Sequence, residues 1–201
     1  MIETGRDPRE GTLEQVGGRW RLRFVRVVPH APEKVWRALT QEAHLAAWFP
    51  TTIEGELRVG APLSFRFRDG DLPPTWGEVI ACEPPRVLEF TWGFSEEDDD
   101  QPERTRFELV PEGDGCRLTF MTTYDRVGKS ARDAAGWHVC FDLLEAHLAG
   151  EPVAGGSPDQ PVILSPSTVA VWKPLNRRYA ERFGPEAATI GPPESMTEYQ
   201  D

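Results

Sequence analysis

The sequence is poor in cysteine and lacks the short motifs that mark most catalytic sites. Its three cysteines are widely separated, with no CxxC pair and no histidine at metal-ligand spacing, which is typical of buried thiols in a reducing cytoplasm. There is no HExxH, no glycine-rich phosphate-binding loop, no GxSxG and no carboxylate pair with a defensible geometry. We therefore predict no catalytic residue, no metal site and no cofactor.

Basic charge and long apolar runs are also scarce. The chain of 201 residues has 33 acidic and 22 basic side chains, so its formal net charge is −11. Nucleic acid and anionic membrane surfaces repel such a chain. No apolar run approaches the length of a membrane span, and residues 1–18 lack the apolar core of a signal peptide. We expect a cytoplasmic protein that binds neither nucleic acid nor membrane.

One acidic run, Glu96–Asp100, raises the question of calcium binding. The run lacks the spaced ligands and the turn glycine of an EF-hand loop. A solvated hairpin tip is therefore the favoured interpretation.

Alternation of apolar and polar residues predicts a β-rich core. In the segment 19–28, Trp20 and Phe24 fall on one face, and Arg21 and Arg23 fall on the other. Strand patterns between turn residues recur in six further segments: 53–58, 63–68, 76–82, 86–92, 104–110 and 116–124. Two short helices are expected after the first strand, one beginning at Pro32 and one running from Gln41 to Ala47.

A long amphipathic helix is predicted after the last strand. Ser130 is a candidate N-cap, and Gly150 is a candidate C′ residue. Between them one apolar stripe recurs at three- and four-residue spacing: Ala134, Trp137, His138, Phe141, Leu144 and Leu148. This stripe must pack on the sheet, so the predicted fold class is α+β, with a curved antiparallel sheet of about six to seven strands wrapped around the helix.

Composition divides the chain into four segments: a flexible N-terminal arm at 1–18, the core domain at 19–150, a linker and amphipathic helix at 151–184, and a disordered tail at 185–201. The helix of the third segment has its own apolar stripe of Trp172, Leu175, Tyr179 and Phe183. We expect this helix to dock on the domain's own surface, with a dimer contact as the alternative.

Four phrases in a fixed order carry a resemblance to a known family. They are HAPEKVWRALTQEAHLAAWF with the strand before it, GEVIACEPPRVLEFTW, RTRFELVPEGDGCRLTF and GWHVCFDLLEAHLAG. Together they cover residues 19–150 and resemble the helix-grip domains of the START/Bet v 1-like (SRPBCC) superfamily. Within it they are similar to the branch named for homologues of the heat-shock-protein-90 ATPase activator. The resemblance implies a sheet that grips the long helix and an internal cavity for an apolar small molecule.

The predicted strands, the segment after the second short helix and the stripe of the long helix supply candidates for lining this cavity. They are Trp48, Phe65, Phe67, Trp76, Phe90, Trp92, Phe107, Phe120, Thr122, Tyr124, Trp137, His138 and Phe141. Thr122, Tyr124 and His138 are the polar members that could orient a ligand's carbonyl or hydroxyl group. For His138 a satisfied core histidine is the favoured interpretation. Large aromatics can also fill a core, and the sequence alone leaves both arrangements open.

The aromatic inner face favours a small-molecule-binding protein, a carrier or sensor of a hydrophobic ligand. Both a monomer and a homodimer stay open. Two alternatives stay open. One is a regulator of a chaperone ATPase that works through protein–protein interaction, with a chaperone or another protein as its partner. The other is a cyclase/aromatase-like or hydrolase-like enzyme on the same fold, for which only Tyr124 and His138 are acid–base candidates.

Overall fold

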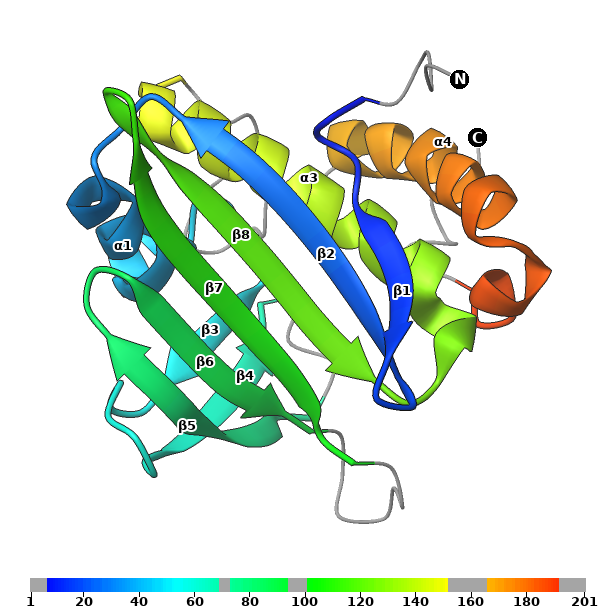
Figure 1. Ribbon diagram of the computed structural model, residues 1–201, viewed down its shortest axis with the longest axis horizontal. Coiled ribbons are helices and arrows are strands. Elements are labelled where there is room, and N and C mark those ends of the chain that lie inside the picture. The colour runs from blue at the N-terminus through cyan, green and yellow to red at the C-terminus, as the bar shows by residue number, and fades with distance from the viewer. Residues whose placement is uncertain (1–6, 69–72, 94–100, 152–165, 192–201) are drawn as a thin grey trace.

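The computed structural model describes residues 7–68, 73–93, 101–151 and 166–191, which form an α+β arrangement (Figure 1). Its strands are β1 (Thr12–Val16), β2 (Arg19–Val28), β3 (Thr51–Glu54), β4 (Pro62–Phe67), β5 (Thr75–Glu83), β6 (Val87–Trp92), β7 (Glu103–Glu112) and β8 (Gly115–Tyr124). Its α-helices are α1 (Pro32–Thr40), α2 (Glu42–Leu45), α3 (Ser130–Ala149) and α4 (Pro166–Phe183), and its 3-10 helices are η1 (Val127–Lys129) and η3 (Pro185–Ala188). The acidic run at 96–100 lies outside the described residues.

All eight strands join one antiparallel sheet in the order β1-β2-β8-β7-β6-β5-β4-β3. Phe120 in β8 lies opposite Phe24 in β2 and opposite Phe107 in β7. This register places the aromatic residues of neighbouring strands on one face, and α3 covers that face (Figure 1). The eight-stranded sheet with a long helix after its last strand is consistent with the helix-grip fold. No helix within the described ranges has the length and apolar character needed to cross a membrane.

The sequence predicts the residue that ends α3 correctly, but not its N-cap. Gly150 has a φ of 75°, and its N–H bonds the last carbonyls of the helix, as predicted for a C-terminal glycine. Ser130 is not the N-cap, because η1 extends the turn upstream and places Lys129 in that position. The Ser130 hydroxyl instead donates to the Val127 carbonyl at 2.6 Å.

Two predictions for the flanking segments are wrong in part. Within the expected flexible arm, Thr12–Val16 forms β1, which pairs with β2 and places Leu13 opposite Leu22. Within the expected tail, Pro185–Ala188 forms η3, and Ala187 is fully buried. Tertiary contacts order β1 and η3. Neither has a local apolar pattern, and for this reason the composition alone suggests disorder.

The C-terminal helix α4 packs against α3 of the same chain (Figure 1). Trp172 and Tyr179, two members of its predicted stripe, are 4% and 1% exposed. Leu175 and Phe183 are partly buried against the same core. The helix therefore extends the core that lies between α3 and the sheet.

A buried hydrogen-bond chain crosses the contact between α4 and α3. The backbone N–H of Gly11 donates to the Tyr179 hydroxyl at 2.9 Å, and this oxygen lies 2.9 Å from Nδ1 of His138. A buried hydroxyl needs an acceptor for its proton, so Tyr179 donates to Nδ1. Neutral His138 then keeps its proton on Nε2, 3.6 Å from Asp142. Burial is the largest cause that lowers the pKa of His138, ahead of the opposing effect of Asp142.

Gly11 is required at this point because the chain passes directly over an aromatic ring. A Cβ atom at position 11 would lie 2.5 Å from the Phe24 ring. Phe24 is itself 1% exposed and has no room to move. Only glycine therefore brings its N–H within reach of Tyr179 here.

We expect Phe141→Ala to lower the free energy of unfolding by about 3–5 kcal/mol, because it leaves a cavity in the ring packing between α3 and the sheet. Phe141 is fully buried, and its ring centroid lies 5.2 Å from that of Phe120. Urea denaturation measures the change. Val27→Ala is the control: Val27 is 61% exposed on the outer face of the sheet, so its effect should stay within about 0.5 kcal/mol. Equal effects of the two changes would show that α3 does not grip the sheet.

The pH dependence of stability follows from the histidines. The pKa values of His30, His138 and His147 all lie below their ordinary value of 6.5 in the folded chain. The unfolded chain therefore binds more protons, and stability should fall as the pH drops below 6.5. Melting temperatures between pH 5.5 and 7.5 test this, and His138→Asn should make the decline shallower. If the melting temperature of this variant depends on pH as steeply as that of the wild type, His138 does not contribute to the pH dependence of stability.

Candidate functional site

Aromatic side chains fill the interior between α3 and the sheet. The ring centroids of Phe120 and Trp137 lie 4.1 Å apart, and those of Phe65 and Trp92 lie 4.8 Å apart. Contacts between neighbouring rings form one continuous network, whose members run in order through Phe24, Phe141, Trp137, Phe120, Phe107, Phe90, Phe65, Trp92, Phe49 and Trp48. The predicted aromatic lining is therefore packed together as a core.

The structure separates the predicted cavity residues into three groups. Those buried in the interior are Trp48, Phe65, Phe90, Phe107, Phe120, Thr122, Tyr124, His138 and Phe141. Those partly buried are Phe67, Trp92 and Trp137. The last is Trp76, which is 63% exposed, so the prediction that it lines the interior is wrong. In β5 the inward position belongs to Thr75, 8% exposed, and alternation sends Trp76 to the outer face.

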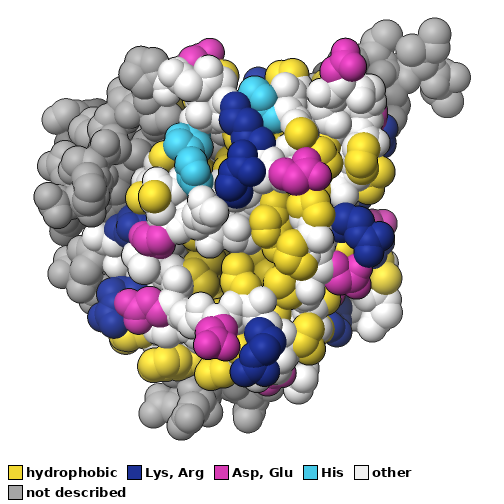
Figure 2. Space-filling model, turned by 90° about the vertical axis from the view of Figure 1, so that its left-hand side faces the viewer, with side chains coloured by type: hydrophobic (Ala, Val, Ile, Leu, Met, Phe, Trp, Pro, Cys, Tyr) yellow, Lys and Arg dark blue, Asp and Glu magenta, His cyan; other side chains and the backbone are white. Residues whose placement is uncertain are grey.

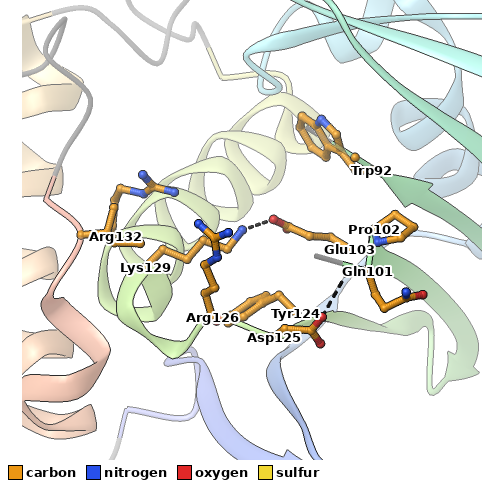
Figure 3. Close-up of a pocket in the computed structure, with 11 residues that line it drawn as sticks. Trp92, Gln101, Pro102, Glu103, Tyr124, Asp125, Arg126, Lys129 and Arg132 are labelled. Carbon is orange, nitrogen blue, oxygen red and sulfur yellow. Dashed lines mark hydrogen bonds and ion pairs between the residues drawn. The ribbon is translucent and has the colours of Figure 1, made fainter. Parts of the chain in front are cut away.

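A pocket of about 400 Å³ opens at one end of the interior, where α3 begins (Figure 3). Its lining comes from the ends of three neighbouring strands, from the start of α3 and from the segment after η3. The residues are Trp92, Gly93, Gln101, Pro102, Glu103, Tyr124, Asp125, Arg126, Lys129, Arg132 and Ile190. Of the predicted cavity residues, only Trp92 and Tyr124 border this pocket.

The aromatic wall of the pocket is held in place from behind. The indole N–H of Trp92 donates to the Thr75 hydroxyl at 2.8 Å, and its ring stacks on Phe65. Tyr124 is 1% exposed, and Lys129 Nζ lies 4.9 Å from the centre of its ring. Burial raises the pKa of Tyr124, with the charge of Asp133 as a smaller cause, so this residue is a neutral phenol at physiological pH. Trp92 thus presents a fixed apolar surface, and the buried ring of Tyr124 lies behind the wall.

Ion pairs join the elements around the pocket. Asp125 follows β8 and accepts from Arg19 Nε at 2.7 Å and from the backbone N–H of Gln101 at 3.2 Å. Lys129 pairs with Glu103 of β7 and lies 3.4 Å from Asp133 of α3 (Figure 3). The start of β7, the end of β8 and the first turn of α3 are therefore held together at the rim.

The basic residues of the rim were missed at the sequence level. Arg126, Lys129 and Arg132 recur every three residues in the stretch that leads into α3. This spacing places side chains on one side of a helical turn. The charge pattern ahead of the long helix is a signal for these residues, whereas the alternation of aromatic residues in the strands is not.

A second groove, of about 440 Å³, lies on the outer face of the sheet. It is lined by Val16, Gly17, Arg19, Arg21, Glu89, Arg104, Arg106, Met121 and Thr123. Its arginines pair with acids: Arg21 with Glu14, and both Arg104 and Arg106 with Glu89. The groove has no aromatic wall among its lining residues, so the pocket beside α3 is the better candidate for an apolar ligand.

The remaining histidines lie near the opposite end of α3 from the pocket. Nδ1 of His44 is 3.0 Å from Nε2 of His147, and Lys34 Nζ is 3.4 Å from Nδ1 of His30. Burial lowers the pKa of His147, with His44 and Lys34 adding to the shift. Figure 2 shows histidine side chains beside lysine and arginine side chains on the face that carries α1. None of these histidines lines the pocket.

Comparison with known families identifies the region that carries the shared sequence. Residues 29–149 match the family described as Activator of Hsp90 ATPase homolog 1-like protein. The matched region begins after β2 and ends with α3, so β1, β2 and α4 lie outside it. No curated protein matches the chain.

Solved structures of bacterial proteins share the fold. The crystal structure of CalU16 from Micromonospora echinospora is 20% identical with a TM-score of 0.63, over 86% of this chain and 96% of that one. A conserved protein of unknown function from Enterococcus faecalis, EF2215, is 19% identical with a TM-score of 0.63, over 86% and 90% of the two chains. MLL2253 from Mesorhizobium loti is 27% identical with a TM-score of 0.56, over 65% and 96%. These likenesses concern the fold and assign no ligand.

Proposed function

The chain belongs to the family of Activator of Hsp90 ATPase homolog 1-like proteins, and we propose that it binds an apolar small molecule in the pocket beside the start of α3. The pocket itself is the observation that carries the proposal. Its volume of about 400 Å³ falls within the range of small-molecule sites, and a fixed aromatic wall faces a polar rim across it. The proposed role is that of a cytoplasmic carrier or sensor.

The ligand in this proposal sits at the mouth of the fold rather than deep between helix and sheet. The aromatic network already occupies the interior, so an internal ligand would have to displace packed rings. At the mouth, an apolar group gains contact with Trp92, Pro102 and Ile190 without disturbing them. The ligand is still an apolar small molecule, as the sequence predicts. Its proposed site is the pocket near the first turn of α3 instead of an internal cavity.

The lining residues favour binding over catalysis. A general base needs a pKa near the working pH, and the raised pKa of Tyr124 makes its phenol a poor base. His138, the other acid–base candidate, faces α4 and takes no part in the pocket. For the remaining alternative, regulation of a chaperone ATPase, the shared family name identifies no partner, because one fold hosts many unrelated functions.

A neutral fluorescent probe, N-phenyl-1-naphthylamine, tests the proposal directly. We expect saturable binding to the wild type with an increase in probe fluorescence. Trp92→Ala should weaken binding about tenfold, which corresponds to about 1.4 kcal/mol of lost contact. Trp76→Ala is the matched control, because it removes the same side chain from the outer face and should leave the dissociation constant unchanged.

A second variant distinguishes loss of binding from loss of folding. Ile190 is 38% exposed, so Ile190→Asp should leave the melting temperature close to that of the wild type while placing a charge in the pocket wall. Weakened binding in both the Trp92 and Ile190 variants would support the site. Absence of saturable binding to the wild type, or equal losses in the Trp76 and Trp92 variants, would overturn it.

A further inference from the structure

We propose that His44 and His147 form a binding site for a divalent transition-metal ion, which joins α2 to the last turn of α3. The observation that carries the proposal is the contact between the two rings, in which Nδ1 of His44 lies 3.0 Å from Nε2 of His147. The site lies near the opposite end of α3 from the pocket, so it does not depend on the proposed function.

The separation of the two nitrogens matches that of two neighbouring ligands on one metal ion. With metal–nitrogen bonds of about 2.0–2.1 Å, a nitrogen–nitrogen distance of 3.0 Å corresponds to an angle of about 95° at the metal. This angle is close to the right angle between neighbouring ligands in square-planar and octahedral sites, and it is narrower than the tetrahedral angle typical of Zn²⁺. The geometry therefore favours Ni²⁺ or Cu²⁺, both of which accept imidazole ligands.

Metal binding replaces the hydrogen bond between the two rings. Two neutral imidazoles at this distance share one proton, which one facing nitrogen donates and the other accepts. When the metal binds, the donor ring carries this proton on its other nitrogen instead, so that both facing nitrogens offer a lone pair. Burial lowers the pKa of His147, which keeps this imidazole neutral at pH 7.5, the form that binds a metal.

Both rings are carried by helices that are anchored in the core. Leu45 follows His44 in α2, Leu148 follows His147 in α3, and both leucines are buried. The two histidines themselves are partly exposed to solvent. His147 lies in the last turn of α3, where the negative end of the helix dipole favours a cation. Ligands on two anchored elements need little rearrangement to bind a metal ion.

The two ligands come from segments that are far apart in the chain. His44 and His147 are separated by 103 residues, so no ligand spacing reveals the pair, and the sequence alone predicts no metal site. Among the residues that the structure describes, no group of three or more histidine, cysteine or acidic side chains could hold a metal ion. Two protein ligands from these residues make an exchangeable site rather than a permanently occupied one.

Lys34 limits the affinity of this site for a cation. Its ammonium group donates to the Leu148 carbonyl at 2.6 Å and lies 3.4 Å from Nδ1 of His30. Its charge also acts on His147, because it contributes to the lowered pKa of that residue. A positive charge so close to the pair repels a metal ion. Removal of this charge should therefore strengthen metal binding, an effect that a merely destabilising substitution would not produce.

Calorimetric titration of the full-length, tag-free chain with NiCl₂ at pH 7.5 tests the proposal. We expect the wild type to bind one Ni²⁺ per chain. His44→Ala and His147→Ala should each weaken binding at least about tenfold, because each removes one of the two ligands. Lys34→Gln should strengthen binding about threefold, because it removes the repelling charge.

His30→Ala is the matched control, because His30 contacts Lys34 but does not belong to the pair, and its affinity for Ni²⁺ should equal that of the wild type. Equal losses in the His30 and His44 variants would show non-specific binding to surface histidines and would overturn the proposal. It would also be wrong if Lys34→Gln failed to strengthen binding, because the ion would then lie away from the pair. Absence of Ni²⁺ binding to the wild type would show that the two rings form a hydrogen-bonded pair only.

Discussion

The packing of aromatic rings between α3 and the sheet is the constraint on which the rest of the structure depends. Phe120 touches Phe24, Phe107, Trp137 and Phe141, so one central ring joins two neighbouring strands to the helix. Because these rings are large and close together, they fix the distance between helix and sheet and occupy the volume enclosed between them. The pocket consequently lies at the end of the fold, where Trp92 and Tyr124 border it.

Periodic patterns in the sequence were sufficient to predict the elements that build this core. Alternation located the strands, and the stripe that contains Phe141 located α3 and the face that it buries. β1 was missed because Leu13 is the one apolar residue in it that faces the core, and its order comes from pairing with β2. Trp76 was placed on the wrong face because a large aromatic in a strand suggests burial, whereas alternation around Thr75 decides its direction.

The site was harder to predict than the fold, for two physical reasons. A stripe on a helix shows which residues are buried but not against what, and His138 is buried against Tyr179 of α4 rather than in a ligand cavity. The volume left empty also depends on how side chains of distant segments pack. Ile190 and Gln101, for example, reach the same pocket from segments that no local pattern connects.

The hydrogen bond between Gly11 and Tyr179 has a consequence for what counts as the folding unit of this protein. Glu10, next to Gly11, accepts from both Arg178 and Arg182, so the segment before β1 and the helix α4 hold each other on the surface of α3. Both lie outside residues 29–149, the part that carries the family's shared sequence. A fragment consisting of residues 29–149 alone would lack β1, β2 and α4. Its strand β8 would become a bare sheet edge, and the apolar flank of α3 would be uncovered. The unit defined by ancestry is thus smaller than the unit defined by folding, and the two flanks are structural members of the domain rather than appendages.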